Sequence, residues 1–571
     1  MFKKFFTVFL LAFLFGQTQS QKKILKSQSE TLISKSRAEK KIAVEKANQK
    51  RWPIKGKLEN GEEYSIQRLA PNGKPIYYHS ENFISAKTIS TNHLWPDGDS
   101  QLFMKGEGMI VGEWDGGATR ATHDELTGRV VQVDGAEELS NHATHVAGTM
   151  IGAGIYNLAH GMANAATLHT NDWNEDSGEM AAQAGDGLIL SNHSYGQRGG
   201  WHWNSLGDDK WVWWGDPDVD VNEDYHFGFY DEQTREWDEI AYNAPHYLIV
   251  MSAGNDRNDE VANGTEHWVW NTVINDWDLS TDSRDPDGPW DCISYHKICK
   301  NVLTVGAVND IENGYENPGD VSISSFSSYG PVDDGRIKPD IVANGVGLFS
   351  SVSTGDQDYE SYSGTSMSAP SVTGSLVLFQ EMYKTMNDTF LLAATLKALA
   401  VHSADEAGNA GGPDYRFGWG LMNTARAVDL IQRNGNGHLI SEEYLAPGDS
   451  IELSVYSDGM VPLRATISWT DPPGIPPLPS LNPQDIMLVN DLDLRIIGED
   501  GTIYFPWILD PNNPGDAATT GDNIVDNVEQ VLIFDPEPGN YTIRIWHKGN
   551  IDDGQAFGLV FSFGTSGPMT F

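Results

Sequence analysis

The stretch Ser363-Gly364-Thr365-Ser366-Met367-Ser368-Ala369-Pro370 decides how the rest of this chain is interpreted. It joins a glycine-containing turn to the apolar run 372–379, which predicts a helix that begins at Ser366. The first turn of a helix has unpaired N–H groups and a partial positive charge, so a hydroxyl there can become a nucleophile beside groups that bind an oxyanion. Pro370 is expected in the first turn, where its missing N–H costs little. Taken alone, the same pattern is more typical of an ordinary Ser or Thr helix cap.

Two upstream motifs contain the side chains that a serine nucleophile needs. In Val111-Gly112-Glu113-Trp114-Asp115-Gly116-Gly117, Asp115 ends an apolar run, and the glycines allow the backbone to turn sharply after it. In Asn141-His142-Ala143-Thr144-His145-Val146-Ala147-Gly148-Thr149, His142 opens a predicted helix. His145 comes one turn later and is expected to be structural, because the zinc motif H-E-x-x-H is absent.

A third motif, Ser252-Ala253-Gly254-Asn255-Asp256, follows the apolar run 247–251. A side-chain amide at the end of a central strand is well placed to donate to an oxyanion, which makes Asn255 the candidate donor. Each of these residues alone has an ordinary alternative, such as an Asn or Asp in a turn. Together, Asp115, His142 and Ser366 occur in one of the chain orders known for the Ser-His-Asp triad.

The blocks D-G-G, H-A-T-H-V-A-G-T, S-A-G-N-D and G-T-S-M-S-A-P resemble those of the subtilisin-like serine peptidases (subtilases), in the family's order and within about residues 105–430. The resemblance implies that Ser366 is the nucleophile and that His142 is the general base. It also implies that Asp115 orients the imidazole and that Asn255 stabilises the oxyanion. Ser194-Tyr195-Gly196 resembles the segment that lines one side of the substrate cleft. The residues implied to bind substrate are Ser194, Tyr195, Gly196, Ala253 and Gly254.

The departures from the family pattern are modest. Gly116 stands where the family more often has threonine, and Ala143 replaces the usual glycine of H-G-T-H. Neither change removes a catalytic group. The C-terminal stretch Leu488-Val489-Asn490-Asp491-Leu492-Asp493-Leu494 is similar to a motif of the oxidatively stable alkaline proteases, a subgroup that couples a subtilase domain to a C-terminal β-barrel or jelly roll.

The pattern of apolar residues predicts two folded units in succession. From about residue 105, apolar runs alternate with helical stretches, which indicates a parallel sheet covered on both faces. After Arg433-Asn434-Gly435-Asn436-Gly437 the apolar period becomes two, which indicates an antiparallel sandwich. The predicted fold class is α/β, a subtilisin-like three-layer domain with a mostly parallel sheet, followed by an antiparallel β-sandwich or jelly-roll domain. The expected strands of the first sheet are 109–114, 188–191, 247–251, 302–308 and 341–343.

Charge and targeting signals divide the chain further. Residues 1–60 have 14 Lys and Arg against 4 Asp and Glu, whereas the remainder has 24 basic and 76 acidic residues. The acidic body argues against a nucleic acid or an anionic membrane as partner. The basic segment is expected to dock on it as a propeptide, with a disordered basic tail as the alternative. The expected units are a signal peptide at 1–20, a propeptide at 21–90, a peptidase domain at 91–432 and the sandwich at 433–571.

Cysteine and carboxylate positions suggest further features. Cys292 and Cys299 are expected to form a disulfide in an exported protein, with two buried free thiols as the alternative. Calcium, in a structural role, is the ion that the family resemblance implies, and oxygen-rich clusters would suit it. The evidence for particular calcium ligands is weak, because acidic residues in loops more often face solvent than bind a metal ion. The candidate ligands are Asp282, Asp285, Asp287, Asp491 and Asp493.

The sequence thus predicts a secreted, monomeric serine endopeptidase that acts on polypeptides and has no integral membrane segment. The cell surface and the periplasm are the alternatives to release into the medium. One alternative is a catalytically silent subtilase fold that acts in binding or adhesion, whose expected sign would be a lost triad residue. Another is an esterase or amidase with the same triad. The Trp-rich segment 199–238 is either an aromatic wall for substrate side chains or an insertion that needs its own small core.

Overall fold

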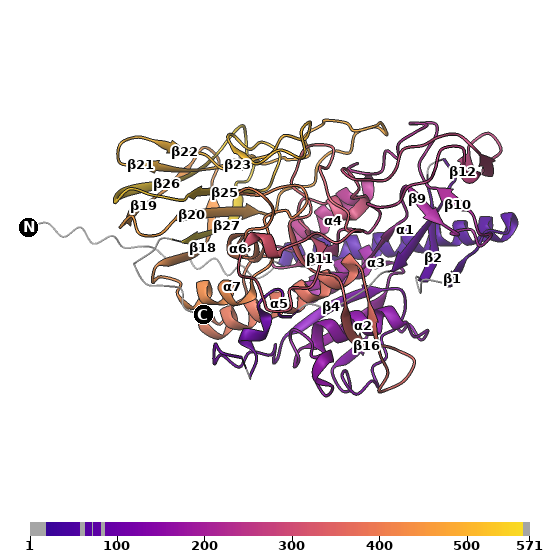
Figure 1. Cartoon of the computed structure of the whole chain (residues 1–571), viewed down its shortest axis with the longest axis horizontal. Helices are drawn as coiled ribbons and strands as arrows, with labels where there is room; N and C mark the ends of the chain where they lie inside the picture. The colour runs from indigo at the N-terminus through magenta and orange to yellow at the C-terminus, as the bar shows by residue number, and fades with distance from the viewer. Residues whose placement is uncertain (1–18, 58–62, 71, 81–85, 97, 563–571) are drawn as a thin grey trace, which may run out of the picture.

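The computed structural model describes residues 19–57, 63–70, 72–80, 86–96 and 98–562 (Figure 1). The molecule is elongated, with the N-terminal helix and strands at one end, the C-terminal sheets at the other and the central α/β domain between them (Figure 1). The predicted signal peptide, residues 1–20, falls almost wholly outside the described residues. Within the described part of the chain, no helix is long and apolar enough to cross a bilayer.

A seven-stranded sheet with parallel pairing throughout forms the centre of the molecule, in the order β15-β14-β11-β7-β4-β6-β5. Every residue of the central strands β11 and β14 is buried, as continuous apolar runs predict for a sheet covered on both faces. The strands are β4 (Ile110–Asp115), β5 (Val130–Gln132), β6 (Thr167–Asp172), β7 (Leu190–His193), β11 (Leu248–Ser252), β14 (Leu303–Val308) and β15 (Ile341–Asn344).

Helices cover both faces of this sheet. Successive residues of β11 point to opposite faces and therefore pack against different groups of helices. Leu248 and Val250 belong to the core that includes α2, α5, α6 and α7, whereas Ile249 and Met251 belong to the core that includes α3 and α4. The mostly parallel sheet of the predicted fold class is therefore confirmed. The helices are α2 (Asn141–Ile151), α3 (Asp176–Asp186), α4 (Glu232–Asn243), α5 (Thr365–Asn387), α6 (Ala393–Ser403) and α7 (Thr424–Gln432), with short 3-10 helices η1 (Thr91–Leu94), η2 (Asn157–Ala159), η3 (Tyr295–Ile298) and η4 (Pro318–Asp320).

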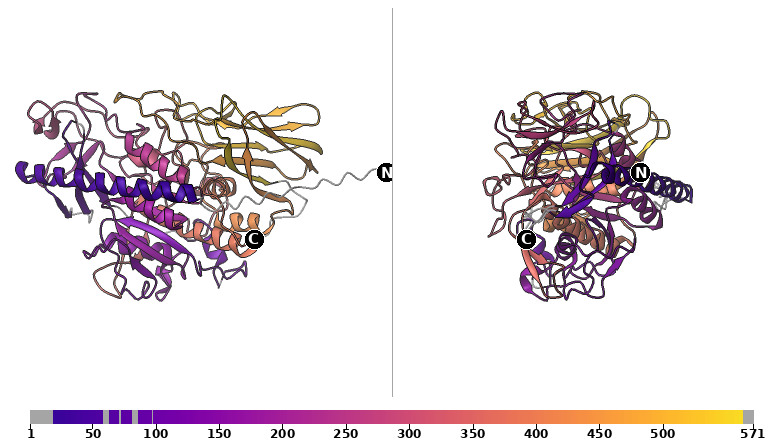
Figure 2. Two further views of the ribbon diagram at one scale, coloured as in Figure 1. Left: turned by 180° about the vertical axis from the view of Figure 1, so that it is seen from behind. Right: turned by 90° about the vertical axis from the view of Figure 1, so that its right-hand side faces the viewer.

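The N-terminal segment folds onto the body of the molecule, where α1 (Gln19–Lys50) runs along α3 (Figure 2). The two helices approach closely because α3 has a glycine at the contact: a Cβ on Gly178 would lie 2.3 Å from Ile33 Cγ1. The segment continues as β1 (Lys55–Lys57), β2 (Glu63–Leu69) and β3 (Pro75–Ser80), which form a sheet in the order β1-β2-β3-β8. Its fourth strand, β8 (Tyr195–Gln197), belongs to the α/β domain and pairs antiparallel with β3.

Ion pairs join this basic segment to the acidic body, as its charge predicts. Arg37 Nε lies 2.5 Å from Glu175 Oε1, and Lys50 Nζ lies 2.7 Å from Asp276 Oδ2. Further pairs join Lys35 to Glu236 and Lys55 to Glu138.

The Trp-rich insertion forms a sheet of its own in the order β13-β12-β10-β9. Its aromatic core consists of Val212, Trp214, Trp270 and Trp277, and it is completed by Ala43, Ala47, Trp52 and Ile66 of the N-terminal segment. Because these rings are buried against one another, they do not form a wall open to substrate, and the interpretation as an insertion with its own core is supported. The strands are β9 (Trp201–Trp203), β10 (Trp211–Trp213), β12 (His267–Asn271) and β13 (Asp276–Ser280).

Two antiparallel sheets form the C-terminal unit, in the orders β18-β27-β20-β25 and β19-β26-β21-β22 (Figure 1). Their inner faces share one apolar core that includes Leu463, Leu494, Ile543 and Phe557. The first sheet packs on α6 of the α/β domain, where Thr395 lies against Gly558. The strands are β18 (His438–Leu445), β19 (Ser450–Ser457), β20 (Leu463–Trp469), β21 (Leu492–Gly498), β22 (Ile503–Tyr504), β25 (Val528–Ile533), β26 (Gly539–His547) and β27 (Gln555–Ser562). Two small pairs are β16 (Leu348–Ser351) with β17 (Tyr359–Tyr362) and β23 (Trp507–Ile508) with β24 (Thr519–Thr520).

Candidate active site

The structure brings Asp115 and His142 into direct contact. Asp115 is the last residue of β4, and His142 lies in the first turn of α2, whose cap Ser140 accepts a hydrogen bond from the N–H of Ala143. Nδ1 of His142 lies 2.6 Å and 2.7 Å from the two carboxylate oxygens of Asp115. The N–H of Gly116 also donates to Oδ1 of Asp115, at 2.6 Å. Because Nδ1 faces two acceptor oxygens, it carries the proton, and the carboxylate fixes the tautomer and direction of the imidazole.

The departure at Gly116 has a structural cause. A Cβ at this position would lie 2.9 Å from Cη2 of Trp173, so the indole occupies the space that a larger residue would need. His145 is confirmed as structural: its Nε2 lies 3.2 Å from the carbonyl of Leu348, and its ring stacks on Tyr362 at 4.9 Å. Burial lowers the pKa of His145 to about 3, which keeps this imidazole neutral.

Glu113 is a buried acid that the sequence reasoning did not consider. It precedes Asp115 by two residues on β4, and Oγ1 of Thr119 lies 3.3 Å from its Oε2. Burial first, and the nearby charge of Asp115 second, raise the pKa of Glu113 well above its usual value.

Ser366 and Ser194 contact each other through two hydrogen bonds. Oγ of Ser366 donates to the carbonyl of Ser194 at 3.0 Å, and Oγ of Ser194 donates to the carbonyl of Ser366 at 2.7 Å. The second bond has a cause in the sequence. Pro370 is the sixth residue of α5, not part of its first turn as expected, and its missing N–H is the one that would bond to Ser366. The hydroxyl of Ser194 takes the place of that N–H.

Asn255 is held beside the start of α5 by Thr365, the residue before Ser366. Oδ1 of Asn255 accepts from the N–H of Thr365 at 2.9 Å and from its Oγ1 at 3.0 Å. The N–H of Gly254 donates in turn to Oγ1 of Thr365 at 3.1 Å. Because a main-chain N–H needs an acceptor, these contacts assign the amide oxygen and leave the NH₂ group of Asn255 as the donor. The sequence alone did not predict that Thr365 anchors Asn255, although Thr365 directly precedes Ser366 in the stretch 363–370.

The five predicted substrate-binding residues follow the ends of two adjacent strands of the central sheet. Ser194, Tyr195 and Gly196 follow β7, and Ala253 and Gly254 follow β11, its parallel neighbour. The side chain of Tyr195 is buried and its hydroxyl donates to Asp176 at 2.8 Å, so this residue presents its main chain. β8 pairs through that main chain with β3, which means that this edge accepts an extended peptide strand.

The predicted disulfide is wrong. Cys292 and Cys299 are both free and buried, and each thiol donates to a different carbonyl, that of Tyr329 and that of Thr234, at 3.4 Å in both cases. The short 3-10 helix η3 lies between them, and Cys299 packs in the core beside α4. Burial raises the pKa of both thiols well above the usual range.

The weak calcium candidates do not form a metal site among the described residues. Oδ1 of Asp493 lies 2.9 Å from Arg495 and 3.1 Å from Lys548, and Oδ2 of Asp491 lies 3.3 Å from Lys548, so a cationic side chain already pairs with one oxygen of each carboxylate. In the other cluster, Asp282 and Asp285 are exposed, whereas Asp287 is buried and accepts from the N–H of Trp201 at 2.8 Å. These carboxylates do not fit a calcium ion in this arrangement.

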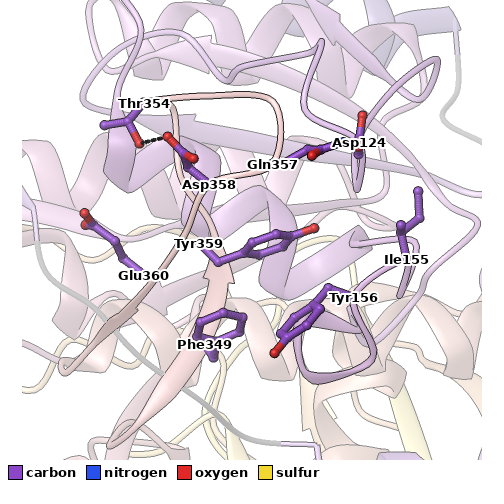
Figure 3. A pocket seen from close by; sticks show the side chains of 9 residues that line it. All are labelled: Asp124, Ile155, Tyr156, Phe349, Thr354, Gln357, Asp358, Tyr359 and Glu360. Atoms are coloured by element: carbon purple, nitrogen blue, oxygen red, sulfur yellow. Dashed lines mark hydrogen bonds between the residues drawn. The ribbon is translucent and has the colours of Figure 1, made fainter.

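A pocket of about 760 Å³ lies apart from these residues, between η2 and the β16–β17 pair (Figure 3). Its aromatic side is a group of three rings, in which Phe349 and Tyr359 stack at 5.3 Å and Tyr156 contacts both. The hydroxyl of Tyr359 donates to Glu125 at 3.1 Å. None of the predicted site residues lines this pocket, so its size does not mark the catalytic centre.

Comparison with known proteins shows the family of the chain. A model described as the subtilase family (Peptidase_S8) matches residues 88–420, more than half of the chain. The chain belongs to the subtilase family. The family to which this subtilase belongs is one of serine-type peptidases. The matched range contains all nine predicted catalytic and substrate-binding residues.

Its relatives are distant or match only in part. The subtilase is 22% identical to the serine protease/ABC transporter B family protein tagA of Dictyostelium discoideum, over 88% of the chain and 32% of that protein. It is 51% identical to the C5a peptidase of Streptococcus pyogenes over 11% of the chain and 5% of that protein. A structure of a mutant of the protease domain of PatA is 18% identical, with a TM-score of 0.39, and the match covers 58% of the chain and 97% of that domain. The chain thus spans about a third or less of the length of these curated relatives.

Proposed function

We propose that this subtilase is an exported serine endopeptidase that cleaves polypeptides through an acyl-enzyme on Ser366. The proposal rests on the contacts of His142 Nδ1 with both carboxylate oxygens of Asp115, at 2.6 Å and 2.7 Å. A carboxylate in this position holds the imidazole in the tautomer whose Nε2 can accept a proton. No triad residue is missing from the sequence, which counts against the silent binding protein.

The proposed reaction uses the chain's own groups in turn. The hydroxyl of Ser366 leaves the carbonyl of Ser194, His142 Nε2 takes its proton, and Oγ attacks the peptide carbonyl. The amide of Asn255 and the N–H groups of the first turn of α5 stabilise the oxyanion. His142 then gives the proton to the leaving amine. A water molecule, deprotonated in the same way, hydrolyses the ester and restores Ser366.

The test compares the intact precursor with its Ser366→Ala form. Both are expressed and checked for folding, and their molecular mass and hydrolysis of casein are followed side by side. We expect only the parent to lose its N-terminal segment and to digest casein. If two folded proteins are both inert on casein and on small esters, the binding protein becomes the better interpretation. Cleavage of small esters without cleavage of casein would favour the esterase.

We also propose that residues 21–90 are a propeptide that inhibits the site until it is removed. The pairing of β3 with β8 supports this, because it occupies the edge at which a substrate strand would bind. The ion pairs of α1 with the acidic body support it too. Residues 81–85, which follow β3, lie outside the described part of the chain.

The C-terminal unit is proposed to be a jelly roll, as in the oxidatively stable alkaline protease subgroup. Numbered in chain order from β18 with the β23–β24 pair left out, its sheets have the orders 1-8-3-6 and 2-7-4-5, an eight-stranded arrangement in which two Greek keys wrap around one core. Secretion and a monomeric state remain proposals that rest on the signal-like N-terminus and on the family. Calcium binding is proposed for the chain as a whole rather than for the five aspartates above. A melting temperature that a chelator leaves unchanged would overturn it.

A further inference from the structure

The two predicted substrate-binding glycines face the amine of one lysine, Lys297. A Cβ on Gly196 would lie 2.6 Å from Cε and 2.9 Å from Nζ of Lys297, and a Cβ on Gly254 would lie 2.9 Å from the same Nζ. The lysine comes from η3, and its carbonyl accepts from Oγ1 of Thr304 at 2.6 Å. The absence of side chains at both glycines therefore leaves the room that the amine occupies.

The charge of Lys297 lacks an ion-pair partner among the described residues, although the side chain is only 3% exposed. Other buried lysines of the domain differ in this respect, since Lys338 and Lys397 lie 2.6 Å and 2.7 Å from carboxylate oxygens of Asp340. The carboxylate of Asp256 faces the same glycine, since its Oδ2 would lie 2.9 Å from a Cβ on Gly254. Burial raises the pKa of Asp256 and the charge of Lys297 acts to lower it, but no ion pair joins the two side chains, so the ammonium can still bind the carboxylate of a substrate.

The register of β3 on β8 shows where a substrate side chain would lie. Ser80 pairs with Tyr195 and His79 pairs with Gly196, so in a substrate strand bound in the same register the next residue would come opposite Ser194. The carbonyl of Ser194 lies 3.0 Å from Oγ of Ser366, which places this next residue at the nucleophile.

The pleat of the strand decides the direction of that side chain. Paired residues of antiparallel strands have their side chains on one face, and residues two apart share a face. The side chain opposite Ser194 therefore lies on the same face as the Cβ position of Gly196. That face is the one on which the Lys297 amine lies.

We propose that Lys297 makes this enzyme prefer a glutamate or aspartate immediately before the scissile bond. The inference rests on the proposed endopeptidase function and adds the class of substrate. The chain's own sequence is consistent with it, because the residue after Ser80 is Glu81. Cleavage of the propeptide is then expected between Glu81 and Asn82, which would give a mature N-terminus at Asn82 and end the propeptide at Glu81 rather than at residue 90.

The test measures kcat/KM on peptides that differ only in the residue before the cleaved bond: Glu, Gln, Leu or Lys. We expect the parent enzyme to favour Glu over Gln by about ten- to a hundredfold, the range for a hydrogen bond between charged groups. The Lys297→Met enzyme should cleave the Glu and Gln peptides equally well, whereas Lys297→Arg should keep the preference for Glu. The Lys297→Glu enzyme should cleave the Lys peptide best. Asp256→Asn should increase the ratio, because it removes a competing carboxylate. Lys210→Met, an exposed lysine paired with Glu266, is the matched control and should change nothing.

The outcomes separate the two proposals. If the parent cleaves the peptides without favouring Glu, or if Lys297→Met retains the preference, the specificity is refuted and the endopeptidase stands. If the folded parent cleaves none of the peptides and no casein, the endopeptidase itself fails. Sequencing of the mature N-terminus gives a second readout, and a terminus other than Asn82, unchanged in Glu81→Gln, would contradict the assignment.

Discussion

Ser194 and Ser366 each donate a side-chain hydrogen bond to the other's main-chain carbonyl, at 2.7 Å and 3.0 Å. The pair joins the first turn of α5 to the residue before β8. It exists because Pro370 cannot donate to Ser366, which leaves that carbonyl without its helical partner. The proposed nucleophile, Ser366, and the strand edge that β3 pairs with are thereby held in a fixed relation.

Removal of the Ser194 hydroxyl should weaken the fold at this point. Ser194→Ala leaves the buried carbonyl of Ser366 without a donor, and we expect a loss of about 1–3 kcal/mol in the free energy of unfolding. Urea unfolding on a Ser366→Ala background, which prevents self-digestion, measures it. The matched control is Ser371→Ala, whose hydroxyl bonds to the Met367 carbonyl four residues before it, where a helical N–H is also available. Equal losses in the two variants would contradict the explanation.

The anchored amide of Asn255 should act mainly in the transition state. Asn255→Ala should lower kcat by about 10²–10³-fold with little change in KM, as expected when one oxyanion donor is lost. Thr365→Val removes one of the two bonds that hold the amide oxygen and should give a smaller loss. Steady-state kinetics on one peptide substrate, corrected by titration of active sites, measures both. A rise in KM at constant kcat would instead assign Asn255 to substrate binding.

The two cysteines should titrate as thiols. We expect two reactive groups per molecule after unfolding without reductant and none in the folded protein, because both thiols are buried. Reaction with a thiol reagent before and after denaturation, with the mass of the labelled chain, gives the count. A count of zero after unfolding would restore the disulfide.

Stability should fall as the pH rises from about 7 to 9, a range in which the buried histidines, whose pKa values burial lowers, are mostly neutral in both the folded and the unfolded chain. Burial raises the pKa of Glu179 to about 9, and burial together with neighbouring acids raises the pKa of Asp291 and Asp333. In the unfolded chain these groups lose their protons near pH 4, so in this window the native state binds more protons and the free energy of unfolding decreases with pH. Melting temperatures of Ser366→Ala across this range test it.

Two variants test whether Glu179 contributes to the decrease in stability with pH. Glu179→Gln should make the decrease shallower, because its side chain no longer titrates. Asp500→Asn is the control: this exposed carboxyl has a lowered pKa, because the N–H and hydroxyl of Thr502 donate to it, and it titrates below the window. Identical slopes in all three proteins would exclude Glu179 as a cause.

Much of the fold could be predicted because the central strands are continuous apolar runs. Runs such as 247–251 and 302–308 correspond closely to β11 and β14, whose burial on both faces leaves no polar residue to interrupt the signal. The strands β5 and β6, at one edge of the sheet, were not predicted, because they are partly exposed and contain residues such as His169 and Gln132. The helix α7 was also missed, since only nine residues form it.

The candidate catalytic residues could be named from the sequence for a different reason: each belongs to a short motif whose residue types the proposed chemistry requires. Lys297 has no such signal, because its importance comes from a contact with two glycines that are 101 and 43 positions before it in the sequence. The pairing of the cysteines was mispredicted for a similar reason. A spacing of seven residues suggests a small loop, but it does not reveal that the two side chains point to different carbonyls.

The aromatic core of the insertion has one consequence for maturation. Trp52, which belongs to the N-terminal segment, packs edge-on against Trp270 at 5.4 Å, and its indole N–H donates to Asp276 at 2.9 Å. Hydrolysis of one peptide bond after β3 breaks none of these contacts. Cutting and departure are therefore separate events, and the severed segment would persist as a bound fragment until it is displaced or digested. Dissociation of the segment would expose to water the indole rings of the segment and of the insertion, which are buried against each other in the precursor. The intrinsic fluorescence of the protein would therefore report dissociation independently of cleavage.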